Sequence, residues 1–156
     1  MIALALGLLL ALEPPALVDE PAIDFEAMDL EGNVVRLSDL EGKVVLLNFW
    51  GIWCKSCRQE IPHLSALDRE WREKGLVVLG ADYGDEAEDL KAFADELRMS
   101  YPILVDDGLA DDYEVLVYPT SVVIDRKGRI RYRVEGYRPE SFDAMRAVVK
   151  LLVEEE

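Results

Sequence analysis

The sequence predicts one three-layer α/β domain built around a mixed sheet. Two observations lead to this prediction: apolar, strand-like runs alternate with amphipathic helical segments, and the last two strands form a hairpin that one more helix follows. At 156 residues, of which 51% are hydrophobic and 31% charged, the chain can bury a core and has the composition of a globular protein.

The expected elements cover the chain from residue 22 onward. The expected strands are short runs bounded by glycine, proline or polar turn residues, and they cover 25–30, 34–37, 44–50, 76–81, 101–105, 121–125 and 129–135. The expected helices repeat apolar residues at three- and four-residue spacing, and they cover 54–74, 86–99 and 139–156, with a weaker helix ending near 113. Run 44–50 is continuously apolar except for Asn48, which is typical of a strand buried on both faces.

The first twelve residues, MIALALGLLLAL, are apolar and uncharged. This run is shorter than the ~20 residues of a membrane-spanning helix and matches the about 7–15 apolar residues of a signal peptide. We therefore expect residues 1–21 to be a signal or anchor segment followed by an extended linker, Pro14 to Pro21, and residues 22–156 to form the domain. A buried N-terminal helix is the alternative, although Glu13-Pro14-Pro15 ends the run abruptly.

The net charge is −15, from 17 basic and 32 acidic residues. Such a charge argues against nucleic acid or an anionic membrane surface as the main partner. It is compatible with a basic polypeptide partner, although solubility alone also accounts for an acidic surface.

The two cysteines of the chain, Cys54 and Cys57, lie where strand 44–50 gives way to a helix. A bridge across two residues closes so small a loop that it removes little chain entropy, so the pair is poorly suited to stapling the fold. A helix N-terminus stabilises a thiolate, and this spacing keeps a second thiol within reach to resolve a mixed disulfide. We expect Cys54 to be the exposed nucleophile of a redox site and Cys57 the buried resolving thiol.

Residues 48–62, NFWGIWCKSCRQEIP, resemble the active-site segment of the TlpA/ResA group, CcmG/DsbE-like extracytoplasmic thioredoxins of the AhpC/TSA–Redoxin superfamily. The resemblance runs from about Ala22 to the C-terminus. It implies a thioredoxin fold with an N-terminal β-hairpin and a central helix–strand insertion over 86–105. It also implies a protein disulfide oxidoreductase that is secreted or N-terminally anchored, in the periplasm or at the outer face of the cytoplasmic membrane.

The resemblance assigns roles to residues far from the cysteines in sequence. Pro119 matches the proline that thioredoxin-like proteins hold in cis beside the disulfide, where the neighbouring backbone can pair with an extended substrate. Trp53, Tyr118 and Thr120 would then contact the substrate.

The acid that serves the buried thiol is expected after the second core strand. Asn48 stands where plain thioredoxin carries a buried acid, and members of the group tend to place a carboxylate after the next strand. Asp85 falls there, and a carboxylate near Cys57 could carry its proton. Asp85 is also a suitable first-turn residue for the following helix, so both interpretations stay open.

The reaction that the resemblance implies is reduction of disulfides in partner proteins such as apocytochrome c, during cytochrome c maturation. Electrons would come from an upstream membrane thiol donor, with no cofactor beyond the Cys54–Cys57 disulfide and no metal. One alternative is a copper-site assembly factor that reduces a cuproprotein or binds Cu(I), although the motif contains no methionine or histidine. A peroxiredoxin-like peroxidase is a weaker alternative, because it needs a single activated cysteine in a different context.

One position departs from the group. Many members have proline immediately before the second cysteine, where this chain has Ser56. The two residues between the cysteines tune the reduction potential, so Lys55 and Ser56 leave the direction of electron flow open.

Overall fold

The structure is a computed structural model that describes residues 15–105 and 108–155. The apolar run expected to be a signal or anchor, residues 1–12, lies outside this part of the chain. Within it, no helix is both long enough and apolar enough to pass through a bilayer.

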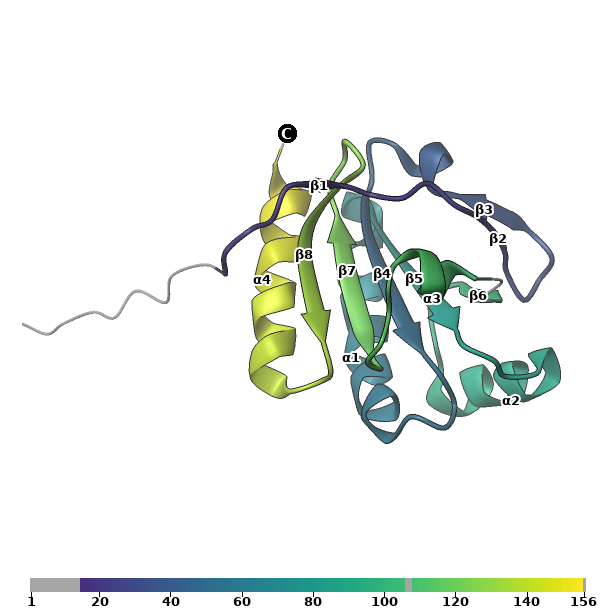
Figure 1. Ribbon diagram of the computed structural model, residues 1–156. Coiled ribbons are helices and arrows are strands. Elements are labelled where there is room, and N and C mark those ends of the chain that lie inside the picture. Colours follow the sequence, from purple (N-terminus) through teal and green to yellow (C-terminus); the bar gives the residue numbers. More distant parts are fainter. Residues whose placement is uncertain (1–14, 106–107, 156) are drawn as a thin grey trace, which may run out of the picture.

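A mixed six-stranded sheet forms the middle of the domain, as predicted (Figure 1). In the order in which they lie, the strands are β1 (Glu20–Pro21), β8 (Arg129–Glu135), β7 (Thr120–Ile124), β4 (Val44–Trp50), β5 (Leu76–Asp82) and β6 (Ile103–Val105). β4, β5 and β6 run parallel, and β7 is antiparallel to both β4 and β8. The predicted N-terminal hairpin is also confirmed, as β2 (Glu26–Met28) paired with β3 (Val34–Arg36).

Different secondary-structure elements cover the two faces of the sheet. The helices are α1 (Lys55–Trp71), α2 (Ala87–Leu97), α3 (Leu109–Asp112) and α4 (Pro139–Glu154), with short 3-10 turns η1 (Leu37–Leu40) and η2 (Arg72–Lys74). α1, α2 and α4 pack on one face, and the hairpin, η1 and α3 pack on the other. Because both faces are covered, every residue of β4 is buried, which explains its continuous apolar sequence.

The end of the segment predicted as a linker is not a free linker but the edge strand β1. The Val18 N–H donates to the Arg131 carbonyl at 2.9 Å, and the Ala22 N–H donates to the Gly128 carbonyl at 3.0 Å. The physical reason is that β8 would otherwise leave backbone groups unpaired along its outer edge. The composition of the segment, rich in proline and acidic residues, gives little sign of this pairing.

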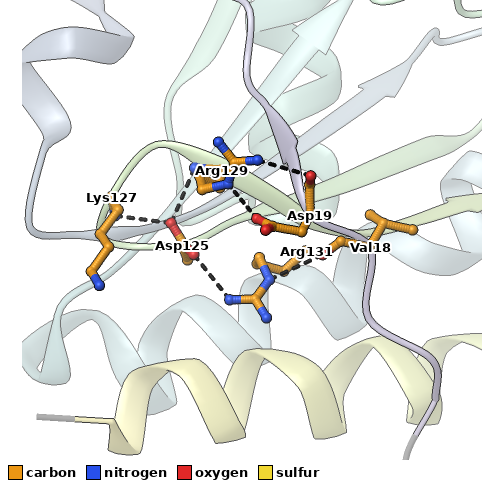
Figure 2. Close-up of polar contacts among 6 residues, drawn as sticks. All are labelled: Val18, Asp19, Asp125, Lys127, Arg129 and Arg131. Carbon is orange, nitrogen blue, oxygen red and sulfur yellow. Dashed lines mark hydrogen bonds and ion pairs between the residues drawn. The ribbon is translucent and has the colours of Figure 1, made fainter.

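Side chains of β8 hold the same segment (Figure 2). Arg129 forms an ion pair with the Asp19 carboxylate and also donates to the Asp19 carbonyl at 2.9 Å. Arg131 donates to the Val18 carbonyl at 3.0 Å and to Asp125 at 3.2 Å. Through the sheet register, β1 lies level with the beginning of β4, with β8 and β7 between the two strands, whereas Cys54 follows the end of β4. The N-terminal segment is therefore fixed at the end of the sheet opposite the cysteines.

Candidate active site

The two cysteines meet at the junction of β4 and α1, as predicted. Cys54 is the N-terminal cap of α1, and its Sγ is bonded to Cys57 Sγ at 2.09 Å, with 5.2 Å between the Cα atoms. The Cys57 backbone N–H donates to Cys54 Sγ at 3.2 Å. The first turn of a helix carries unpaired N–H groups and the positive end of the helix dipole, so a thiolate at Cys54 would be stabilised here.

Cys54 is less exposed than predicted. Only 4% of its surface is accessible in the disulfide form, against none of Cys57. The expectation of a clearly exposed nucleophile is therefore wrong, while the order of the two cysteines is as predicted. The reason is tertiary packing: Cys54 shares a cluster with Cys57 and Trp50, against which Tyr118 also packs.

Exposed aromatic rings surround the disulfide. Trp53 is 60% exposed and lies edge-on to Tyr118, with 5.3 Å between ring centroids. Tyr83 contacts the same Tyr118 ring at 5.4 Å. Trp53 and Tyr118 were expected here, whereas Tyr83 was not assigned a role. The signal that could have found it is its position directly after strand 76–81, because parallel neighbours such as β4 and β5 end at the same edge of a sheet.

The Tyr118–Pro119 peptide bond is cis, which confirms that prediction. The Pro119 carbonyl accepts from the Gly136 N–H at 2.7 Å. Thr120 is fully buried, and its hydroxyl donates to the Val117 carbonyl at 2.6 Å. Its side chain therefore holds the loop before β7. The residue has no accessible surface, and its contact with a substrate stays a prediction.

Asp85 anchors the loop that leads to Cys54. Its Oδ2 accepts from the Ile52 N–H at 2.8 Å, and its own N–H donates to Asp82 Oδ2 at 3.0 Å. These bonds tie the segment after β5 to the segment after β4. Proton transfer by Asp85 to or from Cys57 stays a prediction.

A second carboxylate, Glu60, lies inside the protein one helical turn after Cys57. It is 2% exposed, and its Oε2 accepts from Asn48 Nδ2 at 3.0 Å. Burial raises the pKa of Glu60 to about 7, despite hydrogen bonds from Asn48 and Ser121 that act in the opposite direction. Residues three apart on a helix are neighbours, so this acid lies on the same face of α1 as Cys57.

Sequence reasoning used Glu60 to support the resemblance but gave it no chemical role. The signal was present: Glu60 falls between Cys57 and Ile61 on the face of α1 that helical spacing marks as buried. A lone glutamate on such a face is a buried acid, and burial raises the pKa of an acid unless hydrogen bonds or positive charges outweigh it. Asn48, on β4, holds the Glu60 carboxylate of α1 in place. Its amide Nδ2 donates to Glu60 Oε2 at 3.0 Å and to the Ser121 hydroxyl at 2.8 Å.

The described residues offer two cysteine sulfurs but no ready-made metal site. In residues 15–105 and 108–155, no three histidine, cysteine, aspartate or glutamate side chains are grouped as metal ligands. The redox group that the structure does show is the disulfide itself.

Gly80 gives a stability prediction for the wall beneath the disulfide. A Cβ at Gly80 would lie 2.7 Å from Trp50 Nε1 and 3.0 Å from Tyr101 Cε2, and both rings are buried. We expect Gly80→Ala to lower the free energy of unfolding by about 1–3 kcal/mol, since an overpacked core must shift rigid rings. Urea unfolding of the oxidised protein measures this change. An unchanged midpoint and slope would show that the two rings move at no cost.

Comparison with known proteins gives a consistent result. The sequence profile described as the AhpC/TSA family matches residues 18–133. A relative named thiol-disulfide oxidoreductase ResA, from Bacillus thuringiensis, is 34% identical over 121 residues, which are 76% of this chain and 70% of the relative.

Two solved structures share the fold. The thioredoxin domain of a thiol-disulfide oxidoreductase from Bacteroides vulgatus aligns with a TM-score of 0.74 at 27% identity, covering 86% of this chain and 96% of that one. The exposed lipoprotein thioredoxin Etrx1 from Streptococcus pneumoniae aligns with a TM-score of 0.71 at 33% identity, covering 83% of this chain and all of that one.

Proposed function

The chain belongs to the AhpC/TSA family and is a thiol–disulfide oxidoreductase with a thioredoxin fold, and we propose that it reduces disulfides of partner proteins outside the cytoplasm. The observation that carries the proposal is the Cys54–Cys57 bond at the N-terminus of α1, with the Cys57 N–H directed at Cys54 Sγ. This arrangement presents one sulfur, stabilised as an anion, and keeps the other behind it.

In the proposed reaction, the Cys54 thiolate attacks one sulfur of the partner disulfide, and the partner's other sulfur leaves as a thiolate that takes up a proton. Cys57 then loses its proton to Glu60 and attacks Cys54 Sγ. The Cys54–Cys57 disulfide re-forms and the second partner thiol is released. Two electrons pass to the partner, and Glu60 returns the proton to the products or to solvent.

The surface around Cys54 suits a polypeptide partner. Trp53, Tyr83 and Val117 are partly exposed, and Leu116 is 88% exposed in the loop before the cis peptide. Aromatic rings that keep one face open are typical anchors of protein interfaces. An extended partner segment could pack on these side chains while its disulfide reaches Cys54.

The location is proposed from two further observations. The apolar run of residues 1–12 has the length of a signal-peptide core, and the related Streptococcus protein is described as an exposed lipoprotein. With β1 bound at the opposite end of the sheet from Cys54, an anchor before it would leave the disulfide directed away from the membrane. Apocytochrome c is the substrate that the sequence resemblance suggests, and an upstream membrane dithiol would re-reduce the pair without a further cofactor.

Trapping of partners tests this proposal. In cells that produce the Cys57→Ala variant, Cys54 can form a mixed disulfide that nothing resolves, so covalent adducts should accumulate. We expect mass spectrometry to identify exported proteins with paired cysteines, apocytochrome c among them. The matched control is the double variant Cys54→Ala/Cys57→Ala, which should yield none. Adducts confined to cytoplasmic proteins would contradict the proposed location, and an absence of adducts would contradict the proposed reaction.

A further inference from the structure

The loop before β7, residues 114–119, carries exposed apolar surface beside the disulfide. It joins α3 to β7 on the sheet face that the N-terminal hairpin also covers (Figure 1). Leu116 is 88% exposed in this loop, and Tyr118 contacts the Trp53 ring at 5.3 Å. Because Trp53 directly precedes Cys54, the conformation of the loop determines which apolar surface a partner protein meets near the reactive sulfur.

Glu114 begins this loop with a backbone conformation that is unfavourable for it. Its φ is 51°, in the left-handed region where the Cβ of an L-residue crowds the following carbonyl oxygen. Glycine usually occupies this position after a helix, because it has no Cβ. The Glu114 N–H donates to the Asp111 carbonyl at 3.0 Å, but the last carbonyls of a helix have no partner within it and take a donor from elsewhere.

Arg133, on β8, supplies that donor to two successive carbonyls. Its Nη1 donates to the Tyr113 carbonyl at 2.8 Å, and its Nη2 donates to the Glu114 carbonyl at 3.1 Å. Glu135, two residues further along the strand, forms an ion pair with Arg133 at 3.3 Å. A guanidinium carries its N–H groups in one rigid plane, so a single arginine can bind both carbonyls and fix the turn between them.

The other end of the loop is held without Arg133. The Thr120 hydroxyl donates to the Val117 carbonyl, and the Gly136 N–H donates to the Pro119 carbonyl. Leu116 therefore lies between two fixed points, of which Arg133 supplies the first. Loss of the guanidinium should release residues 114–116 and leave the residues next to β7 in place.

We propose that Arg133 is a positioning residue for partner recognition, because it holds the loop so that Leu116 meets a polypeptide with an apolar side chain next to its disulfide. Arg133 acts through the loop and not on the reacting sulfurs. A loop that is already ordered loses less conformational entropy when the partner binds, so the partner binds more tightly. The inference rests on the proposed reduction of partner disulfides and adds to it the kind of partner segment and the residue that prepares its site.

The test measures single-turnover oxidation of the reduced protein by two disulfides of different size. The Cys54–Cys57 dithiol becomes a disulfide as the oxidant's disulfide becomes two thiols. Insulin presents a polypeptide to the loop, and for Arg133→Met we expect its half-saturating concentration to rise about tenfold at a similar limiting rate, equivalent to about 1.4 kcal/mol. With oxidised glutathione the rate should change by less than about twofold, because so small a disulfide needs no ordered loop.

Three further variants make the result specific. Arg131→Met removes an arginine from the same strand that donates to the Val18 carbonyl, away from the loop, and it should behave as the wild type. Arg133→Lys keeps the charge without the planar group, so we expect a smaller rise of about threefold. In a Leu116→Ser background, Arg133→Met should add less than about twofold, since the side chain that the loop presents is already gone.

Amide hydrogen exchange of the oxidised proteins reports on the loop without any partner. Exchange in residues 114–117 should be about tenfold faster in Arg133→Met than in the wild type or Arg131→Met.

Unchanged exchange in Arg133→Met would overturn the proposal. So would equal effects on insulin and glutathione, or a full effect on insulin that persists in the Leu116→Ser background. A wild type that passes no electrons to insulin would instead contradict the proposed function, and the exchange measurement would then show by itself whether Arg133 holds the loop.

Discussion

Replacement of Cys54 by serine is expected to abolish the reduction of protein disulfides. A serine hydroxyl is not ionised at neutral pH and cannot form a mixed disulfide, so the first step of the reaction is lost. The rate of reduction of a model disulfide such as insulin, with dithiothreitol as electron source, should fall to that of dithiothreitol alone. The volume change is small, so the buried cluster around Trp50 and Tyr118 should stay packed.

The control is Cys57→Ser, which keeps the nucleophile and removes the resolving thiol. It should also fail to turn over, but it should form one equivalent of mixed disulfide with a substrate thiol, whereas Cys54→Ser should form little. A stable adduct formed by Cys54→Ser would reverse the assignment of nucleophile and resolving thiol, and full activity of Cys57→Ser would contradict the resolving role of Cys57. The difference between the variants follows from position, since Cys57 lies behind Cys54 with no accessible surface.

The fold could be predicted from sequence because its core strands are unambiguous. The predicted strand 44–50 has the bounds of β4, since its short length and its valine and aromatic residues favour a strand buried on both faces over a buried helix. The β1 segment could not be predicted. Two residues of strand carry no periodicity, and their pairing depends on the free edge of β8, which exists only once the sheet has formed.

The candidate site also has some features that the local sequence shows and others that depend on contacts made only in the folded protein. The roles of Cys54 and Cys57 follow from their spacing and from the strand-to-helix junction, both of which are local. The accessible area of Cys54 is not local, because it depends on Tyr118, which reaches the site from a distant loop. Likewise, burial against the sheet raises the pKa of Glu60 against the opposing effect of the Asn48 amide, and these contacts join two elements that the sequence shows only separately.

Replacement of Glu60 by glutamine is expected to remove a distinct pH dependence of stability. The pKa of Glu60 is about 7 in the folded protein against 4.5 for the ordinary group. An acid whose pKa is raised by folding stabilises the folded state fully at pH below its unfolded pKa, and this contribution is lost as pH rises through the folded pKa. From pH 4 to pH 8, the unfolding free energy of the wild type should therefore fall by about 3 kcal/mol relative to Glu60→Gln.

Urea unfolding of both oxidised proteins over this pH range measures the difference between their unfolding free energies. The contributions of the other acidic groups cancel in this difference, because both proteins contain them. Asp29 and Asp125 have lowered pKa values despite the effect of burial, because backbone N–H groups and side-chain donors bind their carboxylates, and their contributions are lost only at lower pH. A constant difference between wild type and Glu60→Gln would show that folding does not change the pKa of Glu60.

The same substitution separates two candidates for the proton acceptor of Cys57. If Glu60 accepts the proton, the rate at which Cys57 resolves a mixed disulfide should rise with pH through about 7 in the wild type, and this rise should be lost in Glu60→Gln. Asp85→Asn is the matched control, because an asparagine oxygen can still accept from the Ile52 N–H. Loss of the pH dependence in Asp85→Asn alone would assign the role to the carboxylate that the sequence resemblance places after the second core strand. Loss in Glu60→Gln alone would place it on α1, at a buried acid one helical turn from the thiol.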